Sequence, residues 1–267
     1  MSWDGKDMYV VAENANNNQN VDNVSRISMD HTNVEHDLSG LRAAHHDLTA
    51  IPGGIATLVW NRTGMDAPNA IVERSKDGTL TTVVADLATV YNSTTFHPNS
   101  IHYYAADDSY TIGDTNPGLY VKITRQGQLV WQLGGSNPKD PSKFFQVEPT
   151  WLYNHGHQLL PDGTFLLFNG NNGLAESALV LKLDPASMTA SRVLSYVPTN
   201  GATSFRLGDV QRLPNGNILV IYSISGAFHE ITSSGELVAI LRANQPGNSL
   251  GLGYSEFRET LYGPPPY

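Results

Sequence analysis

A short segment recurs along this chain at a spacing that few folds accommodate. The recurring segments begin a strand pattern at His46, His97, His155 and Gly208, so that successive starts lie 51, 58 and 53 residues apart. Repeats of about 40 to 50 residues are typical of β-propellers, in which each blade of four strands is one repeat. Equivalent positions of successive blades meet around one central channel. The spacing therefore predicts that the three histidines share one site.

Strand signals fill the chain between these starts. Short runs of β-branched and aromatic residues alternate with turns rich in Gly, Pro, Asn and Asp, as in the stretches 97–133, 155–197 and 208–241. Such runs and turns are the pattern of short antiparallel strands. We find no long amphipathic helix pattern and no break between two domains. The sequence predicts one all-β domain over residues 1–267, a single β-propeller of four-stranded blades.

The first blade looks incomplete. The runs 8–12, 24–29 and 34–38 predict its second, third and fourth strands, and its innermost strand is missing. We expect the segment 254–262 to supply that strand, since closing the ring removes an exposed sheet edge. This gives five blades, and six if residues are missing upstream. The chain shows no signal peptide pattern, and its gene product is expected to be longer or trimmed.

Composition excludes several classes of partner. The formal charge of −9, from 16 basic and 25 acidic residues, argues against nucleic acid and anionic membranes as main partners. The absence of cysteine excludes disulfides, thiol catalysis and cysteine-ligated metals. No run of about 18 apolar residues exists, so we expect no membrane-spanning helix.

An ordered set of phrases covering most of the chain resembles the arylsulfotransferase family of β-propellers. The phrases are 45–49 (HHDLT), 97–101 (HPNSI), 107–109 (DDS), 122–123 (KI) with 130–134 (VWQLG), 154–157 (NHGH) and 208–217 (GDVQRLPNGN). The resemblance implies an aryl-sulfate sulfotransferase that is independent of the nucleotide sulfate donor. It implies sulfuryl transfer between small phenolic substrates through a sulfohistidine, with no cofactor and in a periplasmic or secreted location.

The resemblance also assigns positions. His155 takes the nucleophile position, His97 a supporting histidine position, and the pair His45 and His46 another. The arginine that binds the sulfonate in the family falls at Thr115, which carries no charge and no bidentate fork. Arg206 is the nearest alternative cation that we expect at the channel.

The residues make chemical sense in these roles. A neutral imidazole can attack and form a covalent intermediate, which splits one difficult step into two. A second histidine, with an ordinary pKa near 6.5, can donate and accept the phenol proton. Asn99 or a further histidine such as His157 can hydrogen-bond the developing negative charge. Asp47 or Asp209 can orient a ring nitrogen.

Two other functions stay open. The first is a non-catalytic propeller that binds a ligand or partner over its channel, which Thr115 favours. The second is a metal site in which His46, His97 and His155, with Asp209, ring one divalent ion. The polar loop 14–23 is a weaker candidate for calcium.

The remaining aromatic and histidine residues are expected to be structural. We expect His31, His36 and His229 to face solvent, His102 and His157 to serve the structure first, and Trp60 and Trp131 to pack between blades. The sequence does not indicate the sulfate donor, the acceptor or the oligomeric state.

Overall fold

The structure, a computed structural model, describes residues 2–3, 7–12, 23–28, 30, 32–36, 38–41, 43–60, 69–147, 151–170, 177–243 and 254. These residues form twenty-one β-strands and two 3-10 helices, η1 (Leu87–Thr89) and η2 (Pro141–Lys143), and no α-helix is found among them. The prediction of an all-β chain is confirmed.

The first two sheets each contain four consecutive antiparallel strands. The first holds β1 (Ser2–Trp3), β2 (Asp7–Ala12), β3 (Asn23–Ser28) and β4 (Val34–Glu35), and the second holds β5 (Ala44–Ile51), β6 (Gly54–Trp60), β7 (Asn69–Ser75) and β8 (Leu80–Val84). Because β1 pairs with β2, the prediction that the first unit lacks its inner strand is wrong. The segment 254–262, apart from Tyr254, lies outside the described residues.

The third sheet has nine strands and joins two further four-stranded units. They are β9 (Pro98–Tyr104), β10 (Ser109–Asp114), β11 (Leu119–Thr124) and β12 (Leu129–Gly134), then β14 (Asn154–Leu159), β15 (Thr164–Asn169), β16 (Ser177–Asp184) and β17 (Thr189–Tyr196). The short strand β13 (Phe144–Val147) links them, since it pairs in parallel with both β12 and β17.

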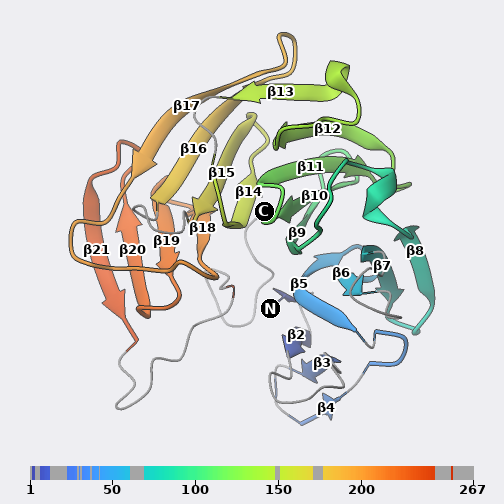
Figure 1. The fold of residues 1–267 in the computed structure, drawn as a ribbon. Helices are drawn as coiled ribbons and strands as arrows, with labels where there is room; N and C mark the ends of the chain where they lie inside the picture. The colour runs from blue at the N-terminus through green and yellow to red at the C-terminus, as the bar shows by residue number, and fades with distance from the viewer. Residues whose placement is uncertain are drawn as a thin grey trace.

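The last sheet again has four antiparallel strands. They are β18 (Asp209–Arg212), β19 (Ile218–Tyr222), β20 (Ala227–Ile231) and β21 (Leu237–Arg242). Figure 1 shows the sheets fanned around a common centre, with β5, β9, β14 and β18 toward the middle and β8, β13 and β21 at the rim. The strand β9 contacts both β5 and β14, and β14 contacts β18. The first residues of these inner strands therefore come close to one another.

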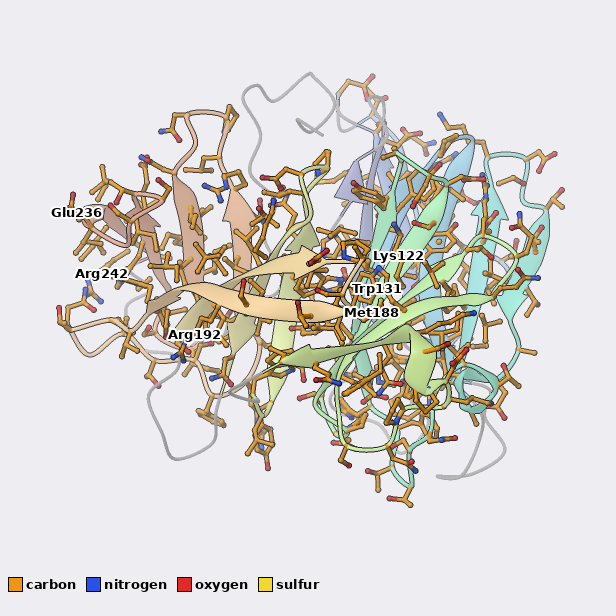
Figure 2. The ribbon with its side chains drawn as sticks, turned by 90° about the horizontal axis from the view of Figure 1, so that it is seen from above. Lys122, Trp131, Met188, Arg192, Glu236 and Arg242 are labelled. Atoms are coloured by element: carbon orange, nitrogen blue, oxygen red, sulfur yellow. The ribbon has the colours of Figure 1, made fainter. Side chains whose placement is uncertain are left out.

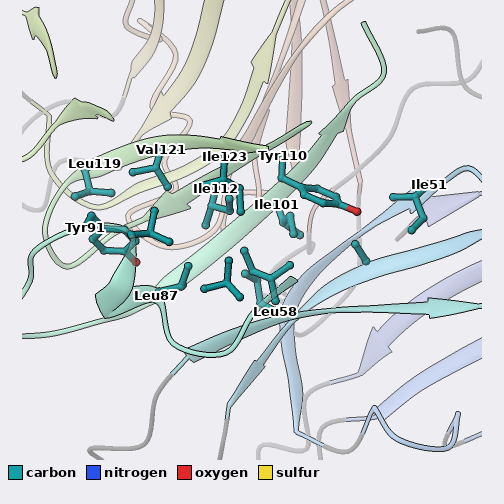
Figure 3. Close-up of a cluster of buried hydrophobic side chains, with 14 residues drawn as sticks. Ile51, Leu58, Leu87, Tyr91, Ile101, Tyr110, Ile112, Leu119, Val121 and Ile123 are labelled. Carbon is teal, nitrogen blue, oxygen red and sulfur yellow. The ribbon is translucent and has the colours of Figure 1, made fainter. Parts of the chain in front are cut away.

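Apolar side chains fill the space between neighbouring sheets. Alternate residues of a strand face the same side, so Ile101, Ile112 and Val121 point from three strands toward Leu58 of the preceding unit. All four side chains are fully buried, and Figure 3 shows them in one cluster. Burying side chains of this size contributes about 1.5–3 kcal/mol each, which fixes one sheet against the next.

Side chains also bridge the inner strands to one another. Each bridge is an oxygen of one unit that accepts a backbone N–H of the next, 54 residues later. The bridges are Asp47 Oδ2 to Ile101 N (2.9 Å), Thr49 Oγ1 to Tyr103 N (3.2 Å) and Gln158 Oε1 to Arg212 N (2.7 Å). They satisfy inner-strand donors that face another sheet and hold the inner strands in fixed relative positions.

Candidate active site

Histidines from three of the four-stranded units converge at the start of the inner strands. The rings of His46 and His97 are 4.7 Å apart between centroids, and those of His45 and His46 are 5.0 Å apart, with their Nδ1 atoms separated by 2.8 Å. His155 is close enough for His46 and His97 to influence its pKa. We call these four residues the histidine cluster. The structure thus brings together the histidines that the repeat spacing predicted would share a site.

The backbone is irregular where these histidines lie. The pairing of β5 with β6 shifts register between Ala44 and Leu48, and that of β14 with β15 shifts between Asn154 and His157. His46 and Tyr153 have φ values of 59° and 55°. Residues with a Cβ rarely adopt this left-handed conformation, and strain of this kind gathers at functional sites. The irregularities turn the side chains of His46 and His155 away from the ordinary strand alternation.

His155 has one ring nitrogen fixed by the backbone. Its Nδ1 lies 2.9 Å from the carbonyl oxygen of Tyr153. A carbonyl oxygen only accepts, so Nδ1 carries the hydrogen and the neutral ring keeps its lone pair on Nε2. Burial, and to a smaller extent the neighbouring His46 and His97, lowers the pKa of His155 from 6.5 to about 4. His155 is therefore neutral at pH 7, with its lone pair on Nε2.

The other members of the cluster differ in how they are held. Burial, and then the neighbouring His97, lowers the pKa of His46 to about 3. His97 is anchored through its backbone N–H, which donates to Asp114 Oδ1 at 2.9 Å. Tyr91 donates to the other oxygen of that carboxyl at 2.6 Å, and burial raises the pKa of Asp114 to about 6. With a pKa of about 3, His46 is a neutral imidazole at pH 7.

Trp60 lines this site, which the sequence did not predict. Its ring centroid lies 4.4 Å from that of His45 and 6.3 Å from that of His97, and the side chain is half-buried. The ring lies between His45 of its own unit and His97 of the next, as expected of a residue that packs between blades, and it also borders the histidine cluster. The expectation for Trp131 is confirmed, because its buried ring contacts Phe145 and Phe165. The position of Trp60 in the sequence could have indicated that it borders the site. Trp60 ends β6, whose last residues pair with the first residues of β5, with Val59 opposite Ala44.

Thr115 and Asn99 stand beside the cluster. The Thr115 N–H donates to the His97 carbonyl at 3.2 Å, and its hydroxyl oxygen is buried with no hydrogen-bond partner among the described residues. Asn99 Nδ2 donates to the Asn154 carbonyl at 2.8 Å, so that amide supports the backbone immediately before His155. The described part of the chain has no Lys or Arg that shifts the pKa of His46 or His155.

The expected charged residues lie in other surroundings. Arg206 is exposed, with its guanidinium 5.4 Å from the ring centroid of Phe205. Asp209 is buried, accepts the Val210 N–H at 2.8 Å and lies directly over Gly156. Asp47 accepts backbone N–H groups from Leu48 and Ile101 with its two oxygens. In these contacts the carboxylates of Asp209 and Asp47 accept hydrogen bonds from backbone N–H groups.

A second layer of histidines lies deeper in the molecule. His157 is fully buried between Ser100 Oγ and Thr111 Oγ1, each at 2.9 Å, and its ring stacks on Phe165 with centroids 5.6 Å apart. Burial lowers its pKa well below 6.5. The His102 ring lies 4.7 Å from that of His157, and burial also lowers the pKa of His102.

His229 is a further correction. It was expected to face solvent, yet it is fully buried, with Nδ1 2.9 Å from the Tyr196 hydroxyl and Nε2 3.2 Å from Asn200 Nδ2. His36 is exposed as expected, and His31 lies outside the described residues.

The described residues show neither a metal-binding cluster nor a membrane-spanning helix. They contain no group of three or more His, Asp or Glu side chains arranged to hold a metal ion. The calcium candidate 14–23 lies outside them except for Asn23. Within the same residues, no helix is long and apolar enough to cross a membrane.

A family model settles the relationship of this chain. A model described as arylsulfotransferase (ASST) matches residues 69–243. The chain belongs to the arylsulfotransferase family. The matched region contains His97, Thr115 and His155, whereas His45 and His46 precede it. Comparison with curated proteins gives no significant match.

Solved structures agree on the fold of this arylsulfotransferase family member. A protein from Lactobacillus plantarum matches with a TM-score of 0.61 and 12% identity, over 97% of this chain and 73% of that one. Streptogramin B lyase matches with a TM-score of 0.56 and 13% identity, over 93% and 69%. Periplasmic gluconolactonase from Pseudomonas aeruginosa matches with a TM-score of 0.52 and 12% identity, over 93% and 83%. The lyase and the lactonase are propeller-type proteins, so the architecture is a β-propeller; at these identities the likeness extends to the fold alone.

Proposed function

We propose that this protein transfers a sulfuryl group between phenolic compounds, with His155 as the nucleophile. The observation that carries the proposal is that His155 is uncharged and has a fixed tautomer, in a chain whose family is named for this reaction. Its Nδ1 hydrogen is held by the Tyr153 carbonyl, and its pKa of about 4 leaves the ring neutral at pH 7. Only a neutral imidazole has a lone pair with which to attack.

The first half-reaction forms the sulfohistidine. His155 Nε2 attacks the sulfur of an aryl sulfate, the N–S bond forms and the bond from sulfur to the aryl oxygen breaks. The electron pair of that bond leaves with the phenolate. The ring, sulfurylated on Nε2 and still protonated on Nδ1, becomes cationic, and the Tyr153 carbonyl oxygen stabilises the charge by accepting the Nδ1 hydrogen.

The second half-reaction returns the sulfuryl group to another phenol. The phenol oxygen attacks the sulfur, the N–S bond breaks and the electron pair returns to His155 Nε2. The acceptor loses its proton to a base, and the first leaving group gains one from an acid. His97 is our candidate for both transfers, because Asp114 anchors its backbone and its ring lies against His46. His46, with a pKa of about 3, acts as a neutral hydrogen-bonding ring.

The substrate groups can be assigned to two sides of the cluster. The half-buried Trp60 ring, in contact with His45 and near His97, offers an aromatic face for the phenol ring. The Thr115 hydroxyl, next to His97, can donate to a sulfonate oxygen. Asn99 holds the backbone before His155, since its amide already donates to the Asn154 carbonyl.

We further infer that the propeller has five blades. The supporting observation is that the described strands form five four-stranded units, β1–β4, β5–β8, β9–β12, β14–β17 and β18–β21, with β13 bridging the third and fourth.

A second candidate function is a binding propeller without catalysis. Thr115 favours it, because a hydroxyl replaces the family's sulfonate-binding arginine and no described Lys or Arg shifts the pKa of His46 or His155. A sulfonate bound without a cation is held more weakly than by a bidentate guanidinium.

Intact-protein mass spectrometry separates the two functions. The protein is incubated with p-nitrophenyl sulfate and then with phenol, beside His155→Ala and His36→Ala, which removes an exposed histidine outside the cluster. We expect one sulfuryl adduct on the wild type and on His36→Ala, discharged by phenol, and none on His155→Ala. Folded wild-type protein that forms no adduct and releases no nitrophenol would support the binding propeller.

A further inference from the structure

The outermost strand of the last unit is apolar and open to solvent. All six residues of β21 (Leu237–Arg242, LVAILR) are exposed, with Leu241 at 68% and Val238 at 52%. In Figures 1 and 2 this strand lies at the rim of the molecule. A long apolar edge strand in water is a pairing site for another strand unless it is covered or interrupted by charge.

The outer strands of the other units differ from β21 because each is covered, short or partly polar. The outer edges of β12 and β17 are both covered by β13, which pairs with each of them. The strand β4 has two residues and includes Glu35, and β8 carries two threonines in its centre. No described strand pairs with the outer edge of β21, which ends the order β18-β19-β20-β21. Among these strands, β21 combines length, apolar composition and an uncovered edge.

The backbone of β21 has hydrogen-bonding groups directed outward. Ala243 N–H donates to Gly226 O, so in an antiparallel ladder Leu241 and Ala239 also face β20. Ile240 and Arg242 then point their N–H and C=O groups away from β20. A register shift opposite Glu230 and Ile231 displaces Val238, which leaves the regular part of the edge at 239–243.

The ends of β21 carry opposite charges. Glu236 immediately precedes the strand and Arg242 ends it, and both are exposed and labelled at the rim in Figure 2. When two identical strands pair in antiparallel fashion, the first residues of one lie beside the last residues of the other. Glu236 of each copy would then lie near Arg242 of the other, with the apolar residues meeting between them.

We propose that two copies of this chain associate through β21, forming a two-fold symmetric, antiparallel strand pair. Such an interface is isologous, because the same surface contributes from both copies. The two four-stranded sheets become one continuous sheet, and the apolar side chains of β21 lose their exposure to water. The histidine cluster lies outside the sheet that contains β21, so the strand pairing does not involve it.

The mass of the protein in solution tests this directly. Sedimentation or light scattering over a range of concentrations is expected to give twice the 29.1 kDa of one chain. Leu241→Lys is expected to give one chain, while Val193→Lys, on the exposed part of β17, leaves the dimer intact as the matched control. A monomeric wild type at 100-fold above its working concentration, or a dimer that survives Leu241→Lys, would overturn the proposal.

Charge exchange and crosslinking test the antiparallel arrangement. Glu236→Arg alone is expected to raise the dimer dissociation constant about threefold to tenfold, and adding Arg242→Glu to restore it, because the exchanged pairs match again. Pairing Glu236 with Arg242 of the other copy puts Ala239 opposite itself. Since the chain has no cysteine, Ala239→Cys is a clean probe and is expected to crosslink two copies, whereas Val193→Cys is not. A double variant no tighter than the single one, or equal crosslinking of both cysteine variants, would contradict antiparallel pairing through β21.

Discussion

His155 and His157 lie two positions apart on one strand, yet their surroundings differ completely. Both are buried, at 8% and 0% exposure. His155 gives one nitrogen to a backbone carbonyl, and the described residues offer Nε2 no hydrogen bond. Both nitrogens of His157 are hydrogen-bonded to hydroxyls, and its ring stacks on Phe165. A histidine can act on a substrate only where the protein leaves one nitrogen uncommitted, so the second nitrogen distinguishes a reactive ring from a structural one.

The largest expected effect is a difference in the rate of sulfuryl transfer between variants of His155 and His157. His155→Ala is expected to lower the rate of sulfuryl transfer by about a thousandfold or more, because the covalent route is lost. The folded fraction of His157→Ala is expected to retain most of the wild-type rate. Nitrophenol release from p-nitrophenyl sulfate, normalised to folded protein, measures both. Equal loss in the two variants would remove the distinction.

The converse effect concerns stability. His157→Ala is expected to lower the free energy of unfolding by about 2–4 kcal/mol, because it opens a cavity beside Phe165 and leaves Ser100 and Thr111 without their buried partner. His155→Ala is expected to lower it by less than about 1 kcal/mol, since it removes one bond to a carbonyl. Urea unfolding followed by fluorescence measures the difference. Stability lost equally in both variants would contradict it.

The pH dependence of stability sharpens the comparison. The pKa of His155 is about 4 in the folded protein and near 6.5 when the chain is unfolded. Below pH 6.5 the His155 side chain of the unfolded chain therefore binds a proton. In the folded protein the same side chain stays neutral down to about pH 4. Proton binding by the unfolded chain therefore lowers the free energy of unfolding as pH falls from 6.5 to 4, by about 3 kcal/mol in total, and has no effect above pH 6.5.

His155→Asn should therefore flatten part of the decline in stability between pH 6.5 and 4. Unfolding by urea at pH 7 and pH 5 gives the slope for both proteins. His46, with a pKa of about 3, keeps its own contribution of the same sign. A slope identical to that of the wild type would show that His155 is not held neutral by the fold.

The repeat made much of this molecule predictable from the sequence. The strands β5, β9, β14 and β18 begin within two residues of the segment starts at 46, 97, 155 and 208, because turns fix their ends and alternation fixes their faces. The convergence of His46, His97 and His155 follows from equivalent places in successive units. The short strand β13 escaped prediction, since four residues carry no clear alternation and its pairing in parallel with two distant strands depends on the assembled sheets.

The site resisted prediction where local irregularity decides the direction of a side chain. In a regular strand, residues 155 and 157 would face the same side, and the register shift between Asn154 and His157 separates them. No composition rule predicts that shift. The burial of His229 is also a tertiary effect, because Tyr196 and Asn200, more than 25 residues earlier, supply its partners.

The smallest expected effect contrasts two tryptophans. Trp60→Ala is expected to raise KM for aryl sulfates about threefold to tenfold with little change in stability, because the half-buried ring offers a face to the substrate. Trp60→Phe should recover most of the affinity, since an aromatic face remains. Trp131→Phe, within the core between Phe145 and Phe165, should change stability and leave KM unaltered. Steady-state kinetics with phenyl and naphthyl sulfates measures this: a KM that depends on ring size in the wild type and loses that dependence in Trp60→Ala places the aryl group against Trp60. A KM unchanged by Trp60→Ala would instead leave its ring as packing for His45 and His97, so that the residue would share the structural role of Trp131.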